Sequence, residues 1–216
     1  KDLGQLKDAE LSTRKAIQLN PDLAEAHSNL GTILKNLDKL EEAELSHRKA
    51  IQLNPNLAEA HYNLGNILST LGKLKDAELS IRKAIELHPN YAEAYLNLSY
   101  LELLKGNYQS GFENYEFRFK TKKPPVLHGN PKIRKIQGTG LQKREKLLVI
   151  SEQGLGDTIQ YMRYIPYLKK QEIDITFCAQ EKLHSLIQAS GIDPNPLTPE
   201  EANTVSEGSW IPLLSL

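Results

Sequence analysis

A 34-residue segment that repeats along the chain constrains the fold more than any other sequence feature. Residues 21–54 are followed directly by residues 55–88, in which about two-thirds of the letters are unchanged. A third copy begins at Pro89 and diverges over residues 89–120. A fixed period in the thirties is typical of solenoid proteins, in which each repeat is one supersecondary unit. Most of the chain is therefore predicted to be a linear array of stacked repeats.

Each repeat is predicted to form two helices. Apolar residues recur at steps of three and four, which places them on one stripe of each helix. The predicted stripes of the first repeat are Leu23, Ala26, Leu30, Ile33, Leu34 and Leu37, then Leu40, Ala43, Leu45, Ala50 and Leu53. Pro55 ends the second helix, because proline disfavours helical geometry in the preceding residue. One helix pair cannot bury its own stripe, so neighbouring repeats must stack.

Residues 1–20 align with the second helix of a repeat, so the array is expected to start on a half repeat and to continue a longer protein. The repeated proline, glycine and alanine positions resemble the tetratricopeptide repeat over residues 1–120. The sequences HSNLG and HYNLG are similar to the repeats of the O-GlcNAc transferase family. The resemblance implies a mainly α superhelix with a protein or peptide partner in its concave groove.

Three asparagines recur in phase and form the candidate peptide-binding site. Asn29, Asn63 and Asn97 are 34 residues apart and are predicted to lie opposite the core stripe. An amide side chain donates and accepts hydrogen bonds at once, so a row of amides can hold an extended peptide backbone. The alternative is that the three residues bond neighbouring helices and stiffen the stack.

Residues 121–145 are predicted to be a linker, since they contain Pro124, Pro125, Pro131, Gly138 and Gly140. The wider segment from Arg118 to Lys146 carries ten Lys or Arg residues and one acid. A solvated linker is the simplest interpretation, and a surface for anionic lipid or nucleic acid is the alternative. The formal net charge of the whole chain is +0, so no DNA partner is expected.

Residues 146–216 are predicted to be an incomplete α/β domain of Rossmann-like type. Apolar runs at 146–152, 173–179 and 210–216 have strand length, and helices are predicted at 158–170 and 182–190. A strand–helix–strand–helix–strand order is typical of a parallel sheet. Because so small a sheet rarely closes a core, the domain is expected to continue beyond Leu216.

The loop after the first of these strands is the second candidate site. In an open parallel sheet, ligands bind beyond the carboxyl ends of the strands. The loop holds Glu152, Gln153, Gly154, Gly156, Asp157 and Thr158. Free amides at the start of the next helix favour an anionic or acceptor ligand. A third glycine for NAD is replaced by Ile159, and no Walker lysine follows, so neither nucleotide motif is present.

The segment ISEQGLGDTIQYMRYIPYL resembles the start of a bacterial glycosyltransferase-like domain, and more distantly the heptosyltransferase family of the GT-B fold. The resemblance implies that Asp157 is the general base for an acceptor hydroxyl, and Arg163 and Tyr164 match the same pattern. The nucleotide-sugar donor of that family binds mainly to a second domain, so this chain is expected to be inactive alone and to need no cofactor. Asp157 as a simple helix cap is the alternative, as is a non-catalytic scaffold with a degenerate α/β segment.

The remaining features favour structural roles. Cys178 is the single cysteine, which excludes an internal disulfide and fits a cytoplasmic location. His27 and His61 recur in phase and are predicted to pack in place of an aromatic residue, with no metal site. No apolar run is long enough to span a bilayer.

Overall fold

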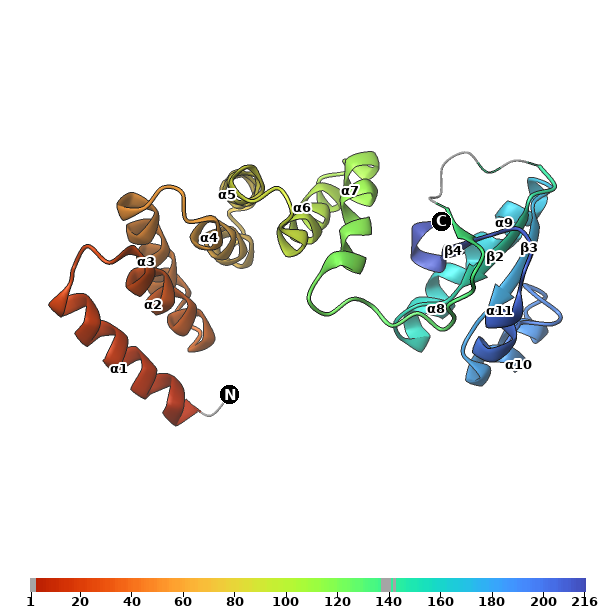
Figure 1. Ribbon diagram of the computed structural model, residues 1–216, viewed down its shortest axis with the longest axis horizontal. Coiled ribbons are helices and arrows are strands. Elements are labelled where there is room, and N and C mark those ends of the chain that lie inside the picture. The colour runs from red at the N-terminus through yellow and green to blue at the C-terminus, as the bar shows by residue number, and fades with distance from the viewer. Residues whose placement is uncertain (1–2, 137–140, 142) are drawn as a thin grey trace. The chain divides into compact units, whose positions relative to one another are not determined.

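The computed structural model describes residues 3–136, 141 and 143–216. They form two compact units, Lys1–Lys122 and Lys123–Leu216. In Figure 1 the first unit runs from red to green and the second from green to blue. Among the described residues, no helix is both long enough and apolar enough to cross a membrane.

The first unit is a stack of helix pairs, as the periodicity predicts. The chain turns back after each helix, and each helix packs on the helices that precede and follow it (Figure 1). The helices are α1 (Leu3–Leu19), α2 (Ala24–Asn36), α3 (Leu40–Leu53), α4 (Ala58–Thr70), α5 (Leu74–Leu87), α6 (Ala92–Leu104) and α7 (Tyr108–Tyr115), followed by the 3-10 helix η1 (Glu116–Lys120). Thus α2, α4 and α6 are the first helices of the three repeats, and α3, α5 and α7 the second.

Small side chains allow the two helices of a repeat to approach closely. Ala43 and Ala77 are fully buried. A Cβ atom added to Gly31 would lie 2.5 Å from the His47 ring, and one added to Gly65 would lie 2.5 Å from Ile81. Glycine is therefore required sterically at both positions, where the second helix packs against the first.

One part of the predicted second stripe is wrong. Leu45 is 68% exposed, and its equivalents Leu11 and Leu79 are 72% and 68% exposed. The buried positions of α3 are instead Ala43, Glu44, His47 and Ala50. Residues 43, 47 and 50 are spaced by four and three, so they share one helix face. Leu45 follows Ala43 by two residues and therefore points away from that face. Leu23 in the first stripe is also exposed, because it precedes α2 at the turn.

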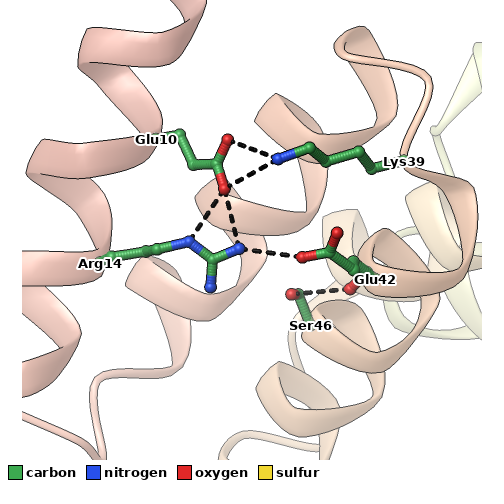
Figure 2. Close-up of polar contacts among 5 residues, drawn as sticks. All are labelled: Glu10, Arg14, Lys39, Glu42 and Ser46. Atoms are coloured by element: carbon green, nitrogen blue, oxygen red, sulfur yellow. Dashed lines mark hydrogen bonds and ion pairs between the residues drawn. The ribbon is translucent and has the colours of Figure 1, made fainter.

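A repeated ion-pair cluster joins neighbouring repeats, and we call it the junction clamp. Figure 2 shows the first one, in which Glu10 binds Arg14 of its own helix at 2.8 Å and Lys39 of the next repeat at 3.0 Å. The second clamp has Glu44 with Arg48 and Lys73, and the third has Glu78 with Arg82 and Lys105. The nearby lysine, and then the arginine, lower the pKa of each of these glutamates.

The second unit is a four-stranded parallel sheet with helices. The strand order is β1-β4-β2-β3. The strands are β1 (Arg134–Lys135), β2 (Lys146–Ile150), β3 (Asp174–Cys178) and β4 (Ser209–Pro212). The helices are α8 (Leu155–Tyr161), η2 (Met162–Tyr164), α9 (Ile165–Lys170), η3 (Glu181–Leu183), α10 (His184–Ala189), α11 (Pro199–Thr204) and η4 (Leu213–Ser215).

The sheet differs from the sequence-based expectation in two places. The predicted linker contains β1, which pairs with β4 through Arg134–Ser209 and Lys135–Trp210. Strand β1 is short and charged, so it gives no apolar run to detect. Gly138 and Gly140 of that segment lie outside the described residues.

The helix predicted over 158–170 begins earlier, at Leu155, and it divides into α8, η2 and α9. Proline at 166 lies in the first turn of α9 and has no N–H for a continuous helix. The third predicted strand ends at Pro212 and is followed by η4.

Candidate functional site

The loop between β2 and α8 was the candidate catalytic site, and two of its side chains face inward. Glu152 is fully buried, and its Oε1 accepts a hydrogen bond from the Leu214 backbone N–H at 3.0 Å. Thr158 is also buried and donates to Gln180 Oε1 at 2.9 Å. These two residues tie the loop to neighbouring segments, so neither side chain is displayed to a ligand.

Gly154 is the N-cap residue of α8, and Asp157 lies in the first turn of the helix, where its carboxylate bonds the N-cap backbone. The Gly154 backbone N–H donates to Asp157 Oδ2 at 3.2 Å. The carboxylate therefore occupies a place that an anionic ligand would take at this helix start. Gly154, Gly156 and Gln153 are exposed, and Gln153 has a φ of 62°. Leu155, which follows Gly154, is also exposed.

The loop nevertheless lies where ligands of open parallel sheets bind. Strand β2 has β3 on one side and β4 on the other, so the strand order reverses there. The carboxyl ends of β2 and β4 are bridged by the Glu152–Leu214 hydrogen bond. A cleft lies elsewhere, at the amino ends of β2 and β3, where Lys146, Asp174, Thr176 and Glu207 line a volume of about 380 Å³. No residue of the candidate loop lines that cleft.

The three predicted asparagines form one row, which we call the asparagine row. Asn29 is exposed on α2, and Asn63 and Asn97 lie at the same position of α4 and α6. Asn63 Nδ2 donates to Thr32 Oγ1 at 3.5 Å. Asn97 Nδ2 donates to Asn66 Oδ1 and, at 3.3 Å, to the Tyr62 hydroxyl. The amides therefore link the first helices of successive repeats, as the stiffening alternative predicts.

The same amides keep free hydrogen-bonding capacity. The bonds of Asn63 and Asn97 use the Nδ2 atoms, and no described residue donates to their Oδ1 atoms. Asn29 has no side-chain partner among the described residues. The row therefore keeps two amide oxygens, and at Asn29 a whole amide, without a hydrogen-bond partner among the described residues.

A second row of polar residues lies one helical turn before the asparagines and was missed in the sequence. Glu25, Glu59 and Glu93 each precede an asparagine by four residues, so both side chains share a helix face. Burial raises the pKa of Tyr91, and the nearby Tyr62, Glu59 and Glu93 raise it further. The tripeptide AEA, which recurs in all three repeats, is the sequence pattern that could have identified this row. We call these three residues the glutamate row.

Comparison with known proteins identifies the repeats. Models of the tetratricopeptide repeat match residues 58–91, residues 33–72, and residues 13–44 with 81–111. Residues 13–111 are tetratricopeptide repeats. The matched residues end before the α/β unit, and no curated protein matches the chain.

Solved structures of MamA resemble the tetratricopeptide array. One crystal structure is 28% identical, with a TM-score of 0.50, and covers 54% of this chain and 68% of that chain. Another is 27% identical, covers 58% and 72% of the two chains, and has a TM-score of 0.48. A fragment of MamA from Desulfovibrio magneticus RS-1 is 20% identical, covers 56% and 71%, and has a TM-score of 0.49. The first of these structures supports the fold of the array.

The histidines of the tetratricopeptide array have structural contacts. His27 Nε2 lies 2.9 Å from the Pro21 carbonyl oxygen, and His61 Nε2 lies 3.0 Å from that of Pro55. Each ring therefore bonds the turn that precedes its own helix. In the third repeat Tyr95 takes this position and stacks on Phe117 with ring centroids 3.9 Å apart. No cluster of potential metal ligands occurs among the described residues.

Cys178 is buried in β3, as predicted, and its thiol donates to the His128 carbonyl oxygen at 3.0 Å. Burial raises the pKa of this thiol to about 12. A thiol that stays protonated at neutral pH is a poor nucleophile. Cys178 therefore acts as a small core residue.

Proposed function

We propose that the tetratricopeptide array binds a protein partner, and that an extended segment of the partner lies along the asparagine row. The observation that carries this proposal is the row itself, in which three amides recur on α2, α4 and α6 with hydrogen-bonding capacity to spare. Extended backbone offers one donor and one acceptor per residue, which amide side chains can match without reading sequence.

Stiffening and binding are compatible in this arrangement. The Nδ2 bonds to Thr32 and Asn66 hold the amides in one orientation before a peptide arrives. A pre-ordered side chain loses less entropy on binding than a mobile one. The same contacts that stiffen the stack therefore favour binding.

The test is a selection of random 12-residue peptides against the whole chain, followed by affinity measurement with Asn29→Ala/Asn63→Ala/Asn97→Ala. We expect the triple variant to lose at least tenfold in affinity with a melting temperature within a few degrees of the parent. Gln18→Ala/Gln52→Ala is the matched control, because it removes exposed amides from the second helices α1 and α3. Unchanged affinity in the triple variant, or an equal loss in the control, contradicts the proposal.

The glycosyltransferase-like role of residues 146–216 stays a prediction from sequence resemblance, with Asp157 as its base and Glu152, Gln153, Gly154, Gly156 and Thr158 around the acceptor. The hydrogen bond from the Gly154 N–H to Asp157 favours a structural role at the start of α8.

We expect Asp157→Ala to cost about 1 kcal/mol in the free energy of unfolding, as loss of a capping bond does. We also expect no sugar transfer from nucleotide-sugar donors by this chain. Measurable transfer that Asp157→Ala abolishes would support the catalytic assignment instead.

A further inference from the structure

We propose that two copies of this chain pair through the last face of the tetratricopeptide array, at four apolar residues of the third repeat. These residues are Tyr100 and Leu104 of α6 and Tyr108 and Phe112 of α7, and each is more than half exposed. We call them the end patch. None of them belongs to the asparagine row, so the pairing of two copies goes beyond the proposed function.

The end patch lies at one end of a helix pair. Helices α6 and α7 pack on each other and are joined by a turn at residues 105–107, so the end of α6 lies beside the start of α7 (Figure 1). Within each helix the two patch residues are four apart and therefore share one face. The four side chains are thus neighbours on the α6–α7 pair.

The position of Tyr100 contacts the following repeat elsewhere in the array. Asn66 holds this position in the second repeat and accepts a hydrogen bond from Asn97 of the third. Thr32 holds it in the first repeat and accepts a hydrogen bond from Asn63 of the second. Tyr100 therefore lies where one repeat meets the next.

The positions of Tyr108 and Phe112 meet the following repeat in the same way. Leu74 holds the Tyr108 position in the second repeat and packs against a core cluster that includes residues of α6. Glu78 holds the Phe112 position and binds Lys105 of the third repeat in its junction clamp. The end patch is therefore the stacking face of the third repeat.

The chemistry of this face differs from that of the earlier stacking faces. Phe112 replaces the clamp glutamate, and Glu116 replaces the clamp arginine. Tyr100 stands where the first two repeats have a threonine and an asparagine. The residues with which the earlier repeats bind their neighbours are thus exchanged for aromatic ones. This face is suited to an apolar, aromatic partner and not to another repeat of the same kind.

A second copy of the chain carries such a surface. The end patch contains no charged residue, so two copies placed face to face bring no like charges together within it. Tyrosine and phenylalanine are enriched in protein interfaces, and charged residues are depleted at their centres. In a two-fold arrangement the same patch serves both copies. Each copy then buries its aromatic rings against those of the other, and such ring pairs stabilise an interface beyond the area that they bury.

Sedimentation of the whole chain from about 1 to about 200 µM tests the pairing, because a dimer fraction rises with concentration. Leu104→Thr/Phe112→Glu gives the third repeat the residues of the second, Thr70 and Glu78, and is therefore expected to fold. We expect it to raise the dissociation constant of the dimer at least tenfold, because it places an unpaired carboxylate in an apolar interface.

A second variant and a matched control complete the experiment. Tyr100→Asn introduces the residue of the second repeat, Asn66, and is expected to weaken the dimer in the same direction. Leu45→Thr/Leu79→Glu makes a similar change among the exposed leucines of α3 and α5 and should leave the dimer unchanged. Circular dichroism melts show which variants keep the fold, and Tyr100→Asn decides if the double variant does not.

A chain that stays monomeric up to about 200 µM overturns the pairing, since no dimer then forms by mass action. A dimer that the folded end-patch variants leave intact, or that the control weakens as much, also overturns it. Peptide binding is measured separately on the asparagine row, so its failure would contradict the proposed function without affecting these outcomes.

Discussion

At the scale of single residues, His47 is the least expected member of the core. Its ring is fully buried, and neither nitrogen has a hydrogen-bond partner. Ile81 holds the equivalent position of the next repeat and packs beneath Gly65 as His47 packs beneath Gly31. Burial, with a smaller effect of Lys35, lowers the pKa of His47 to about 4 from the ordinary value of 6.5.

This pKa predicts an acid-sensitive array. As the pH falls below 6.5, the unfolded chain takes up a proton at His47 while the folded chain stays neutral until about pH 4. The free energy of unfolding therefore decreases as the pH falls from 6.5 to 4, by up to about 1.4 kcal/mol per pH unit. Above pH 6.5 this loss of stability is absent.

We expect His47→Ile to raise the free energy of unfolding by about 1–3 kcal/mol at pH 7, because two unpaired buried nitrogens are removed, and to remove this pH slope. Circular dichroism melts at several pH values between 4.5 and 7 measure both effects. Exposed His88→Gln is the control and should keep the slope. A His47→Ile variant that is less stable, or equally acid-sensitive, would show that His47 has a partner or access to water.

At the scale of elements, the junction clamps are predicted to stabilise the stacking of repeats. Glu44 is 9% exposed and binds both Arg48 and Lys73, whereas the exposed Lys83–Glu86 pair lies within one helix. We expect Glu44→Gln to cost about 1 kcal/mol in the free energy of unfolding, and Glu86→Gln to cost too little to measure. Denaturant melts of both variants at 50 and 500 mM salt test this, and a loss in Glu86→Gln as large as in Glu44→Gln would contradict it.

The elements that the sequence predicted well are those with a strong local pattern. Helix pairs in the repeats follow from three- and four-residue spacing and from the turn prolines. The exposed Leu45 shows the limit of that pattern, since apolar character alone does not say which face of α3 meets its neighbour. Strand β1 has no apolar signal at all, because pairing with β4 defines it. Helix α8 begins at Leu155 with Gly154 as its N-cap, so Asp157 bonds the backbone from within the first turn and does not precede the helix as the sequence suggested.

At the scale of the whole molecule, the period of the array located the candidate binding residues. Phase alone placed Asn29, Asn63 and Asn97 on equivalent positions, and the structure adds their bonds to Thr32 and Asn66. The glutamate row was equally periodic, but its residues were not singled out in the sequence. In the α/β unit, sequence identified the loop after β2 but could not show that Glu152 and Thr158 turn inward.

The exposed leucines of the second helices offer a different surface for a partner. Leu11, Leu45 and Leu79 recur in phase on α1, α3 and α5. A partner that binds there would not need the asparagine row. A demonstration that the array binds a peptide would therefore not show where the peptide binds. The position of the bound peptide distinguishes the asparagine row from the exposed leucines.

Amide chemical shifts of the whole chain, recorded with and without a selected peptide, test the central claim most directly. The account predicts that the largest changes fall on α2, α4 and α6, around Asn29, Asn63 and Asn97. Changes concentrated on α3 and α5 around Leu45 and Leu79, or in the loop between β2 and α8, would contradict it.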